Sequence, residues 1–298
     1  MSHSDAAPSL RSLLGRGRIV VAPGAYDALS ALLIEQAGFA AIYLTGNGQT
    51  ASMLGLPDLG FITLSEMAER VRCIGAVTTL PLIADADVGY GSLLNVRRAM
   101  RELEAAGASA VQFEDQVSPK KCGHELGRAI VPVAEMEQRL RAAADGRRNA
   151  ETLIVARTDA RTTHGLAEAI RRGRAYAQAG ADVIFVESPE SEAEFQEVAA
   201  GIPVPTLANM VETGRSPYLS AQRLGELGFA VAIYPATAFL AATRAVREAM
   251  ALLRRDGRIA DLTRLATLQE YHEALGFARY AALESALAAA TANTQDAE

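Results

Sequence analysis

The chain has 298 residues, of which 50% are hydrophobic, and a formal net charge of −6. This acidic balance provides no basic field that would attract nucleic acid, so we exclude a nucleic-acid partner. The chain begins without a basic segment followed by an apolar run, and no apolar stretch approaches the roughly 20 residues that cross a bilayer, so we expect no membrane partner. With two cysteines and no export signal, a protein of the reducing cytoplasm is expected.

Eight short apolar segments are predicted to form β strands. Four of them follow a helical pattern that ends in Gly, as Gly107 does before the segment 110–113. Gly adopts the left-handed conformation that ends a helix, and apolar runs of this length suit buried parallel strands. In chain order the predicted strands are 18–21, 41–44, 81–84, 110–113, 153–156, 183–186, 204–208 and 231–233.

Helical patterns separate most of these strands, and eight alternating units predict a closed (β/α)8 barrel, an α/β fold, rather than an open sheet. After the last strand, the segments 236–255 and 262–292 are predicted to be helices, with Asp256 and Gly257 between them. We expect residues 1–298 to form a single barrel domain with a C-terminal helical extension over 256–292.

Polar residues follow each predicted strand. In a (β/α)8 barrel the chemistry lies at this carboxyl end of the strands, so these residues are the candidate site. The candidate substrate-binding residues at or after these strand ends are Tyr43, Thr45, Gly46, Asn47, Arg157, Glu187 and Asn209.

Asp85, Asp87 and Glu114 follow neighbouring strands, and Asp58 lies in a preceding loop. Carboxylates so close together repel one another unless a cation lies among them. A set of hard oxygen ligands without histidine favours Mg²⁺, with Mn²⁺ as the other possibility. The alternative interpretation of the Asp-x-Asp pair is helix capping and turn formation after a strand.

Arg157 ends the fifth strand behind apolar Ile154 and Val155. An arginine directed at the barrel mouth suits a carboxylate or a developing oxyanion, and an ion pair with Glu187 is the structural alternative. The segment 45–48, Thr-Gly-Asn-Gly, offers backbone N–H groups that can approach an anion.

A loop with the sequence Lys-Lys-Cys-Gly-His covers residues 120–124. Two ammonium groups and an imidazole beside the thiol of Cys122 favour the thiolate and proton transfer at sulfur. We therefore predict catalytic roles for Cys122, Lys121 and His124, in addition to Arg157 and Glu114, and a substrate contact for Gly123. The alternatives are a solvated basic loop or a zinc ligand, although the other cysteine, Cys73, lies in a helical segment without paired Cys or His spacing.

Taken together, these motifs resemble the isocitrate lyase and phosphoenolpyruvate mutase superfamily over roughly residues 23–292. The resemblance is carried by the cysteine loop, Asp85-x-Asp87, and the segments 56–58, 114–116 and 156–160. It implies a Mg²⁺-dependent (β/α)8 barrel whose last barrel helix is exchanged between partners in a homotetramer, a dimer of dimers. It also implies that the loop around Cys122 closes over the substrate.

The lyase branch of this superfamily implies a particular chemistry. Asp85 would be the direct metal ligand, and Asp58, Asp87 and Glu114 would act mostly through water. The C2–C3 bond of a 2-hydroxy acid would break in a retro-aldol sense, with Arg157 and the metal stabilising the developing oxygen charge. Cys122 would then protonate the enolate carbon. Mutases and phosphonate hydrolases of the superfamily lack this cysteine loop, which favours carbon–carbon cleavage.

Three positions bear on the substrate. Methylisocitrate lyases carry two arginines for a third carboxylate where this chain has Leu240 and Leu268, and oxaloacetate-cleaving relatives have a hydroxyl or imidazole where Pro235 stands. The resemblance therefore implies a lyase for a small hydroxy-dicarboxylate, 2,3-dimethylmalate or a 2-alkylmalate, that releases pyruvate or a related keto acid and a short carboxylate. The alternatives are a 2-methylisocitrate lyase, which forms pyruvate and succinate, then an oxaloacetate hydrolase or decarboxylase. A catalytically silent, metabolite-binding barrel is the non-enzyme alternative.

Overall fold

The structure is a computed structural model that describes residues 8–121, 123 and 127–295. It contains two compact units, Met1–Leu240 and Ala241–Glu298. The first unit holds all the described strands, and the described part of the second unit contains helices and their connections.

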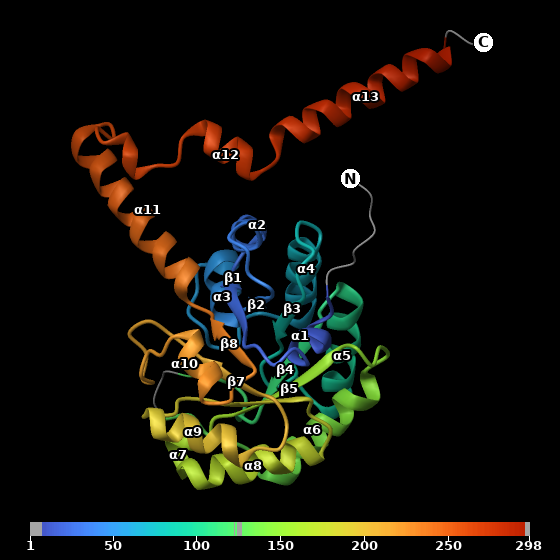
Figure 1. Ribbon diagram of the computed structural model, residues 1–298, viewed down its shortest axis with the longest axis vertical. Coiled ribbons are helices and arrows are strands. Elements are labelled where there is room, and N and C mark those ends of the chain that lie inside the picture. The colour runs from blue at the N-terminus through green and yellow to red at the C-terminus, as the bar shows by residue number, and fades with distance from the viewer. Residues whose placement is uncertain (1–7, 122, 124–126, 296–298) are drawn as a thin grey trace. The chain divides into compact units, whose positions relative to one another are not determined.

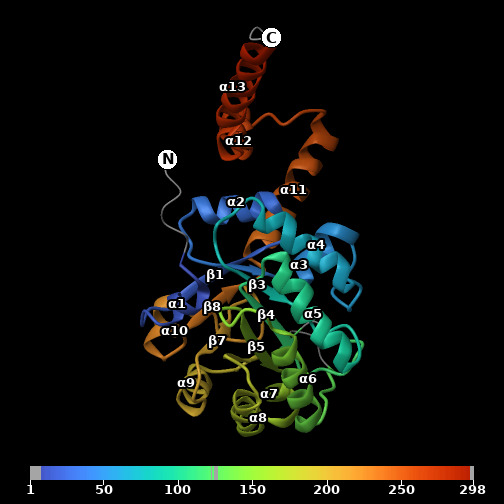
Figure 2. The same ribbon diagram turned by 90° about the vertical axis from the view of Figure 1, so that its right-hand side faces the viewer.

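Eight parallel strands form a closed barrel in sequence order, and β1 pairs with β8 to complete it. Figures 1 and 2 show these strands in the middle of the first unit, with helices around them. The predicted (β/α)8 barrel is therefore confirmed. The strands are β1 Val20–Ala25, β2 Ile42–Leu44, β3 Leu82–Asp85, β4 Ala110–Glu114, β5 Leu153–Thr158, β6 Val183–Val186, β7 Thr206–Asn209 and β8 Val231–Tyr234.

The first strand differs most from its prediction, because it runs on through Pro23 and Gly24 instead of ending at residue 21. Pro and Gly usually weaken a strand. Pro23 instead lies opposite Tyr234 in the ladder with β8. A Cβ atom on Gly24 would lie 2.2 Å from the carbonyl oxygen of Pro235, so the glycine permits close packing within the sheet.

Helices connect the strands and cover the outside of the barrel. On α5 the buried residues Val96, Ala99, Met100 and Leu103 follow helical spacing, which directs one apolar face at the strands. The helices of the first unit are α1 Leu10–Leu14, α2 Ala28–Gln36, α3 Gly46–Leu54, α4 Leu64–Gly75, α5 Leu93–Ala106, α6 Val133–Gly146, α7 Ala160–His164, α8 Leu166–Gln178, α9 Glu192–Gly201 and α10 Ala221–Glu226.

The short helix α1 closes the amino-terminal end of the barrel. Its side chains Leu10 and Leu13 are buried in the same apolar cluster as Val20, Leu153 and Val183, which begin or lie near the start of their strands. Outside this cluster, Arg11 of α1 forms an ion pair of 2.9 Å with Asp182, just before β6. The candidate site lies at the opposite, carboxyl end of the strands.

Helix α11, Thr237–Asp256, begins in the first unit and continues into the second. It confirms the predicted helix 236–255. The second predicted helix, 262–292, is wrong in its continuity. Thr267 caps a new helix by accepting from the backbone N–H of Glu270, and Gly276 takes a left-handed conformation at φ 68°. These signals divide the segment into a 3₁₀ turn, Leu262–Arg264, and the helices α12 Leu268–Ala274 and α13 Phe277–Gln295.

None of the described helices combines the length and apolar character that a membrane crossing needs.

Candidate active site

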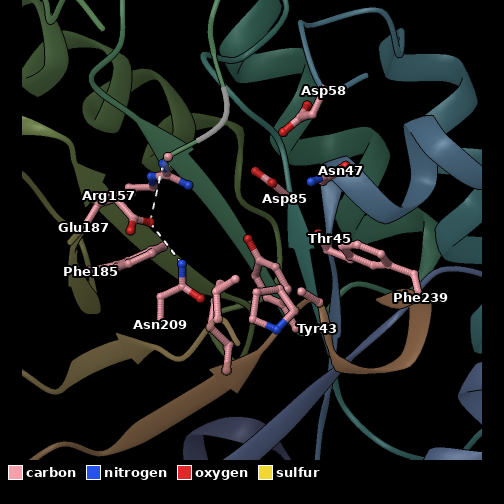
Figure 3. Close-up of a pocket in the computed structure, with 15 residues that line it drawn as sticks. Tyr43, Thr45, Asn47, Asp58, Asp85, Arg157, Phe185, Glu187, Asn209 and Phe239 are labelled. Atoms are coloured by element: carbon pink, nitrogen blue, oxygen red, sulfur yellow. Dashed lines mark hydrogen bonds and ion pairs between the residues drawn. The ribbon is translucent and has the colours of Figure 1, made fainter. Parts of the chain in front are cut away.

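A pocket lies at the carboxyl ends of the strands, and Figure 3 shows the side chains around it. Arg157, Glu187 and Asn209 lie on one side, and Asp58, Asp85 and Asn47 lie on the other. The described residues that line it are Tyr43, Thr45, Asn47, Asp58, Asp85, Gly123, Arg157, Phe185, Glu187, Asn209, Val211, Ile233, Pro235, Ala236 and Phe239.

Three predicted metal ligands come together beside this pocket. Asp85 and Glu114 end the neighbouring strands β3 and β4, and Asp87 follows Asp85 in a turn with φ 47°. One carboxylate oxygen from each residue lies within 4.8 Å of the others, and all three side chains are buried. Asp85 is held from two sides, because its carboxylate accepts from the backbone N–H of Gly46 at 3.2 Å and from Gln112 at 3.1 Å.

Lys120 contributes a buried ammonium group to this cluster. Its Nζ lies 2.5 Å from Asp58 and 2.8 Å from Asp87. In the sequence Lys120 indicated only a positive neighbour for Cys122. The structure instead commits its charge to the carboxylates of Asp58 and Asp87, so Asp58 lies next to the cluster as predicted but with a lysine partner.

Burial raises the pKa of two carboxyl groups of the cluster. Burial raises the pKa of Asp87 to about 6, with Asp85 and Asp58 adding to the rise and Lys120 opposing it. Burial likewise raises the pKa of Glu114 well above its ordinary value, against the opposing charge of Arg157. A second cation among these groups would favour their ionised forms.

The donor set fits a divalent metal ion. All three groups offer hard carboxylate oxygens, and one oxygen of Glu114, Oε1, has no hydrogen-bond partner among the described residues. An unpaired buried carboxylate oxygen is costly unless a cation or a donor satisfies it. The cluster can therefore hold a metal ion.

Arg157 lies in β5, one residue before the end of the strand, and its side chain is 10% exposed at the pocket. Its guanidinium carbon lies 5.1 Å from the centre of the Phe185 ring. The predicted ion pair with Glu187 is present at 3.5 Å, and Glu114 lies at the same distance. Its main partner is Asp159, which lies in the motif 156–160 but was not predicted to pair with Arg157. Asp159 accepts from Nε at 3.0 Å and from Nη2 at 2.9 Å, a bidentate pair that fixes the plane of the guanidinium.

The other predicted substrate-binding side chains take these positions. Asn209 donates to Glu187 at 3.1 Å, and Tyr43 donates its hydroxyl to Gln112 at 3.1 Å. Burial raises the pKa of Tyr43 well above its ordinary value, so the phenol keeps its proton. Thr45 and Asn47 line the pocket at the start of α3.

Besides Lys120, two further residues of the loop are described, and they are placed differently. Gly123 lines the pocket, whereas Lys121 donates to the carbonyl of Gly127 at 3.3 Å and is absent from the lining residues that the structure describes. Cys122 and His124, the predicted catalytic pair of the same loop, lie outside the described residues. The other cysteine, Cys73, is exposed on α4, where the sequence predicted a helix.

The packing of Gly123 against Arg157 leads to a testable prediction. A Cβ atom at this position would lie 2.4 Å from Nη2 of Arg157 and 2.9 Å from the carboxylate of Glu187. Gly123→Ala should therefore displace the guanidinium and lower kcat/KM by about 10²-fold, as expected when a positioned group moves by about 1 Å. Steady-state kinetics would measure this loss.

Gly15→Ala is the matched control for this substitution. Gly15 has a right-handed conformation, φ −72°, and its Cβ would only make ordinary contact at 3.6 Å with the carbonyl of Ser12. Equal activity in the two alanine variants would contradict the close packing of Gly123 on Arg157.

Sequence reasoning missed a group of apolar residues that line one part of the pocket. Val211, Ile233, Ala236 and Phe239 lie there beside Pro235, which the resemblance had singled out. Leu240 is 42% exposed and is not among the lining residues, and Leu268 belongs to the second unit. A strand alternates its faces, so Ile233 could have been assigned to the inside of the barrel from its position in the last strand.

A barrel with buried carboxylates and a fixed arginine at the carboxyl ends of its strands has the arrangement of the (β/α)8-barrel enzymes, whose active sites lie at this end. The sequence pattern of the phosphoenolpyruvate phosphomutase family matches residues 10–254. The chain belongs to this family, within the PEP mutase/isocitrate lyase superfamily.

Named relatives extend over nearly the whole chain. A 2,3-dimethylmalate lyase of Eubacterium barkeri is 46% identical over 94% of this chain and 97% of its own length. A 2-methylisocitrate lyase of Bacillus subtilis is 43% identical over 96% of this chain and 95% of its own. A solved structure of 2,3-dimethylmalate lyase matches with a TM-score of 0.89 at 38% identity and covers 96% of each chain. The resemblance inferred from the motifs is confirmed.

Proposed function

We propose that this protein is a Mg²⁺-dependent carbon–carbon lyase that cleaves a 2-hydroxy dicarboxylate of the 2,3-dimethylmalate or 2-alkylmalate type. The products would be an α-keto acid such as pyruvate and a short carboxylate. The observation that carries the proposal is the combination of a buried carboxylate cluster, which reaches the pocket through Asp85, with Arg157 and an apolar lining. The family relatives named as lyases support the same reaction class.

The residues supply the binding and the charge stabilisation that this cleavage needs. Asp85, Asp87 and Glu114 would hold Mg²⁺, with Asp58 nearby, and a bound Mg²⁺ would polarise the oxygens of the hydroxy acid. Arg157 is fixed by Asp159 and directs its guanidinium into the pocket, where a substrate oxygen gains negative charge. Tyr43, Thr45, Asn47 and Asn209 can donate hydrogen bonds to the substrate carboxylates.

The reaction balances without a redox partner. The 2-hydroxyl loses its proton as C2 becomes a carbonyl, the C2–C3 bond breaks, and its electron pair passes to C3 to form the enolate of a carboxylate. Proton delivery to C3 completes the second product. We retain Cys122 as the proposed donor of that proton, with His124 and Lys121 in the same loop as its proposed partners, and Gly123 as a substrate contact.

The pocket lining favours a dicarboxylate with alkyl substituents. Arg157 is the one arginine or lysine among the described lining residues, and Asp58, Asp85 and Glu187 are negative. A third carboxylate against Val211, Ile233 and Phe239 would lack a cationic partner, and an unpaired buried charge costs several kcal/mol. Methyl groups bury favourably on the same apolar surface.

A panel of substrates tests the proposal. Keto-acid release should be measured with Mg²⁺ for 2,3-dimethylmalate, 2-alkylmalates, 2-methylisocitrate and oxaloacetate. Because every 1.4 kcal/mol corresponds to about tenfold, we expect kcat/KM to favour an alkylmalate over 2-methylisocitrate by at least ~100-fold. Equal or faster cleavage of 2-methylisocitrate would replace the proposal by the second candidate, 2-methylisocitrate lyase, which the B. subtilis relative supports.

The remaining proposals concern assembly and location. We propose a cytoplasmic homotetramer, a dimer of dimers in which the last barrel helix is exchanged, built from a single barrel domain with a C-terminal helical extension. Exposed apolar side chains on α11 and α13, including Val246, Met250, Leu283 and Leu287, support burial of these helices by another surface.

A further inference from the structure

Asp159 joins two arginines through one buried carboxylate. Its side chain is fully buried. Oδ1 accepts from Nη2 of Arg157 at 2.9 Å and also pairs with Nη1 of Arg128, while Oδ2 accepts from Nε of Arg157 at 3.0 Å. Arg157 reaches the pocket from this carboxylate, whereas Arg128 is not a lining residue.

Arg128 is built into the site rather than exposed to solvent. Its side chain is 1% exposed, and its second nitrogen, Nη2, donates to the hydroxyl of Thr162 at 2.7 Å. A buried arginine loses its hydration and is retained at low free energy only where carboxylates and acceptors replace the lost water. Asp159 and Thr162 provide those partners for Arg128.

Gln116 connects the same carboxylate to a second point of the chain. Its Nε2 lies 3.3 Å from Oδ2 of Asp159 and 2.9 Å from the carbonyl of Lys121, and its Oε1 accepts from the backbone N–H of Lys121 at 3.0 Å. The backbone of Gln116 also forms a bridge with Ile130. Two residues of the connection between β4 and α6 therefore contact Asp159: Gln116 near the start of the connection and Arg128 near its end.

The charges around Arg157 explain why a second arginine matters. Arg157 faces three carboxylates, those of Asp159, Glu114 and Glu187. Three carboxylates around a single guanidinium would offset much of its attraction for an anionic substrate. Arg128 is a second cation beside Asp159 and balances part of the charge of that carboxylate. Asp159 can therefore orient Arg157 while offsetting less of its positive charge.

We propose that Arg128 is a positioning residue for the reaction, acting through the shared carboxylate of Asp159 on the orientation and available charge of Arg157. This inference rests on the proposed function for its kinetic consequence, but not for the contact itself. The group that Arg157 would stabilise gains charge only during bond cleavage, so loss of Arg128 should lower kcat more than it raises KM.

The kinetic arm compares Arg128→Met, Arg128→Lys and the wild-type enzyme. We expect Arg128→Met to lower kcat at least ~10-fold with KM changed by less than ~3-fold, and Arg128→Lys to restore kcat to within ~3-fold because a lysine can keep the charge beside Asp159. Thr162→Val removes the second contact of Arg128, together with the bond of 3.3 Å from the Thr162 hydroxyl to the backbone carbonyl of Asp159, and should retain kcat because both side-chain contacts of Asp159 with the arginines remain. Arg141→Met is the matched surface control, since Arg141 is 64% exposed and pairs only with Glu137 among the described groups.

The stability arm does not depend on the reaction. Melting temperatures are compared for Arg128→Met, Arg157→Met and the double variant. If the two arginines share Asp159, each single variant leaves that carboxylate one guanidinium, and only the double variant leaves it none. The double variant should therefore lose more in Tm than the sum of the two single losses.

The outcomes separate the two proposals. Additive losses in Tm, or equal kcat values for Arg128→Met and Arg141→Met at a temperature where both are folded, would overturn the role of Arg128. If no substrate of the panel is cleaved by the wild-type protein, the proposed function fails, while a greater than additive Tm loss still supports the shared carboxylate.

Discussion

Replacing Arg157 by Met is expected to lower kcat by about 10²–10³-fold, the loss that follows removal of one fixed group that stabilises a developing oxyanion. The guanidinium lies at the pocket and is held in one plane by Asp159, so it requires little reorganisation when the substrate oxygen gains charge. Steady-state kinetics with the best substrate of the panel would measure the effect.

Stability has to be measured with this variant. Met at position 157 would leave the carboxylates of Asp159, Glu114 and Glu187 without their shared cation, and breaking a buried ion pair costs about 3–5 kcal/mol. Arg157→Lys is the companion variant, because it keeps one positive charge but loses the bidentate contact. Folded Arg157→Met protein with a kcat near that of the wild type would remove Arg157 from the mechanism.

Loss of metal binding should have a comparable or larger effect. Asp85→Asn removes a carboxylate that Gly46 and Gln112 hold in place, and metal stabilisation worth several kcal/mol corresponds to about a 10³-fold loss in kcat/KM. Excess EDTA should abolish turnover of the wild type, and added Mg²⁺ should restore it. Asp145→Asn is the matched control, since Asp145 is exposed and pairs with Arg97. Full activity in EDTA would contradict a metal-dependent mechanism.

Metal affinity should also depend on pH in a defined direction. Burial raises the pKa of Asp87 to about 6, and a carboxylate has to lose its proton before it binds a cation. Affinity for Mg²⁺ should therefore fall as the pH drops through about 6, by up to about tenfold per unit for Asp87 alone. Protonation of Glu114, whose pKa burial also raises, should add to this fall. Calorimetric titration between about pH 5 and 8 would show this, and an affinity independent of pH across that window would oppose it.

The fold was predictable because short apolar runs in the sequence mark the strands, and a Gly that ends the preceding helix marks several of them. Gly107 ends α5 in a left-handed conformation, φ 110°, and an apolar strand follows at once, as the pattern required. The first strand was misplaced because Pro23 and Gly24 usually mark a turn, and the contact of Gly24 with Pro235 joins residues far apart in the sequence. Local signals therefore gave the number of strands more reliably than their ends.

The site was predictable only in part, for the same physical reason. Asp85, Asp87 and Glu114 could be grouped because barrel geometry brings neighbouring strand ends together. The cations that pair with the other carboxylates of the site could not be inferred. Lys120 pairs with Asp58 across 62 positions of sequence, and Arg128 pairs with Asp159 across 31. Periodicity in the sequence does not record such contacts.

Helix α1 gives the barrel a blind end. Leu10 and Leu13 are packed into the floor among the first residues of the strands, so in the part of the chain that the structure describes the pocket opens only at the carboxyl side. A substrate that is cleaved inside a pocket with one open end leaves two products that share one exit. The product nearer the opening leaves before the deeper one, so product release is ordered. This gives a physical reason for product release, rather than bond cleavage, to limit turnover.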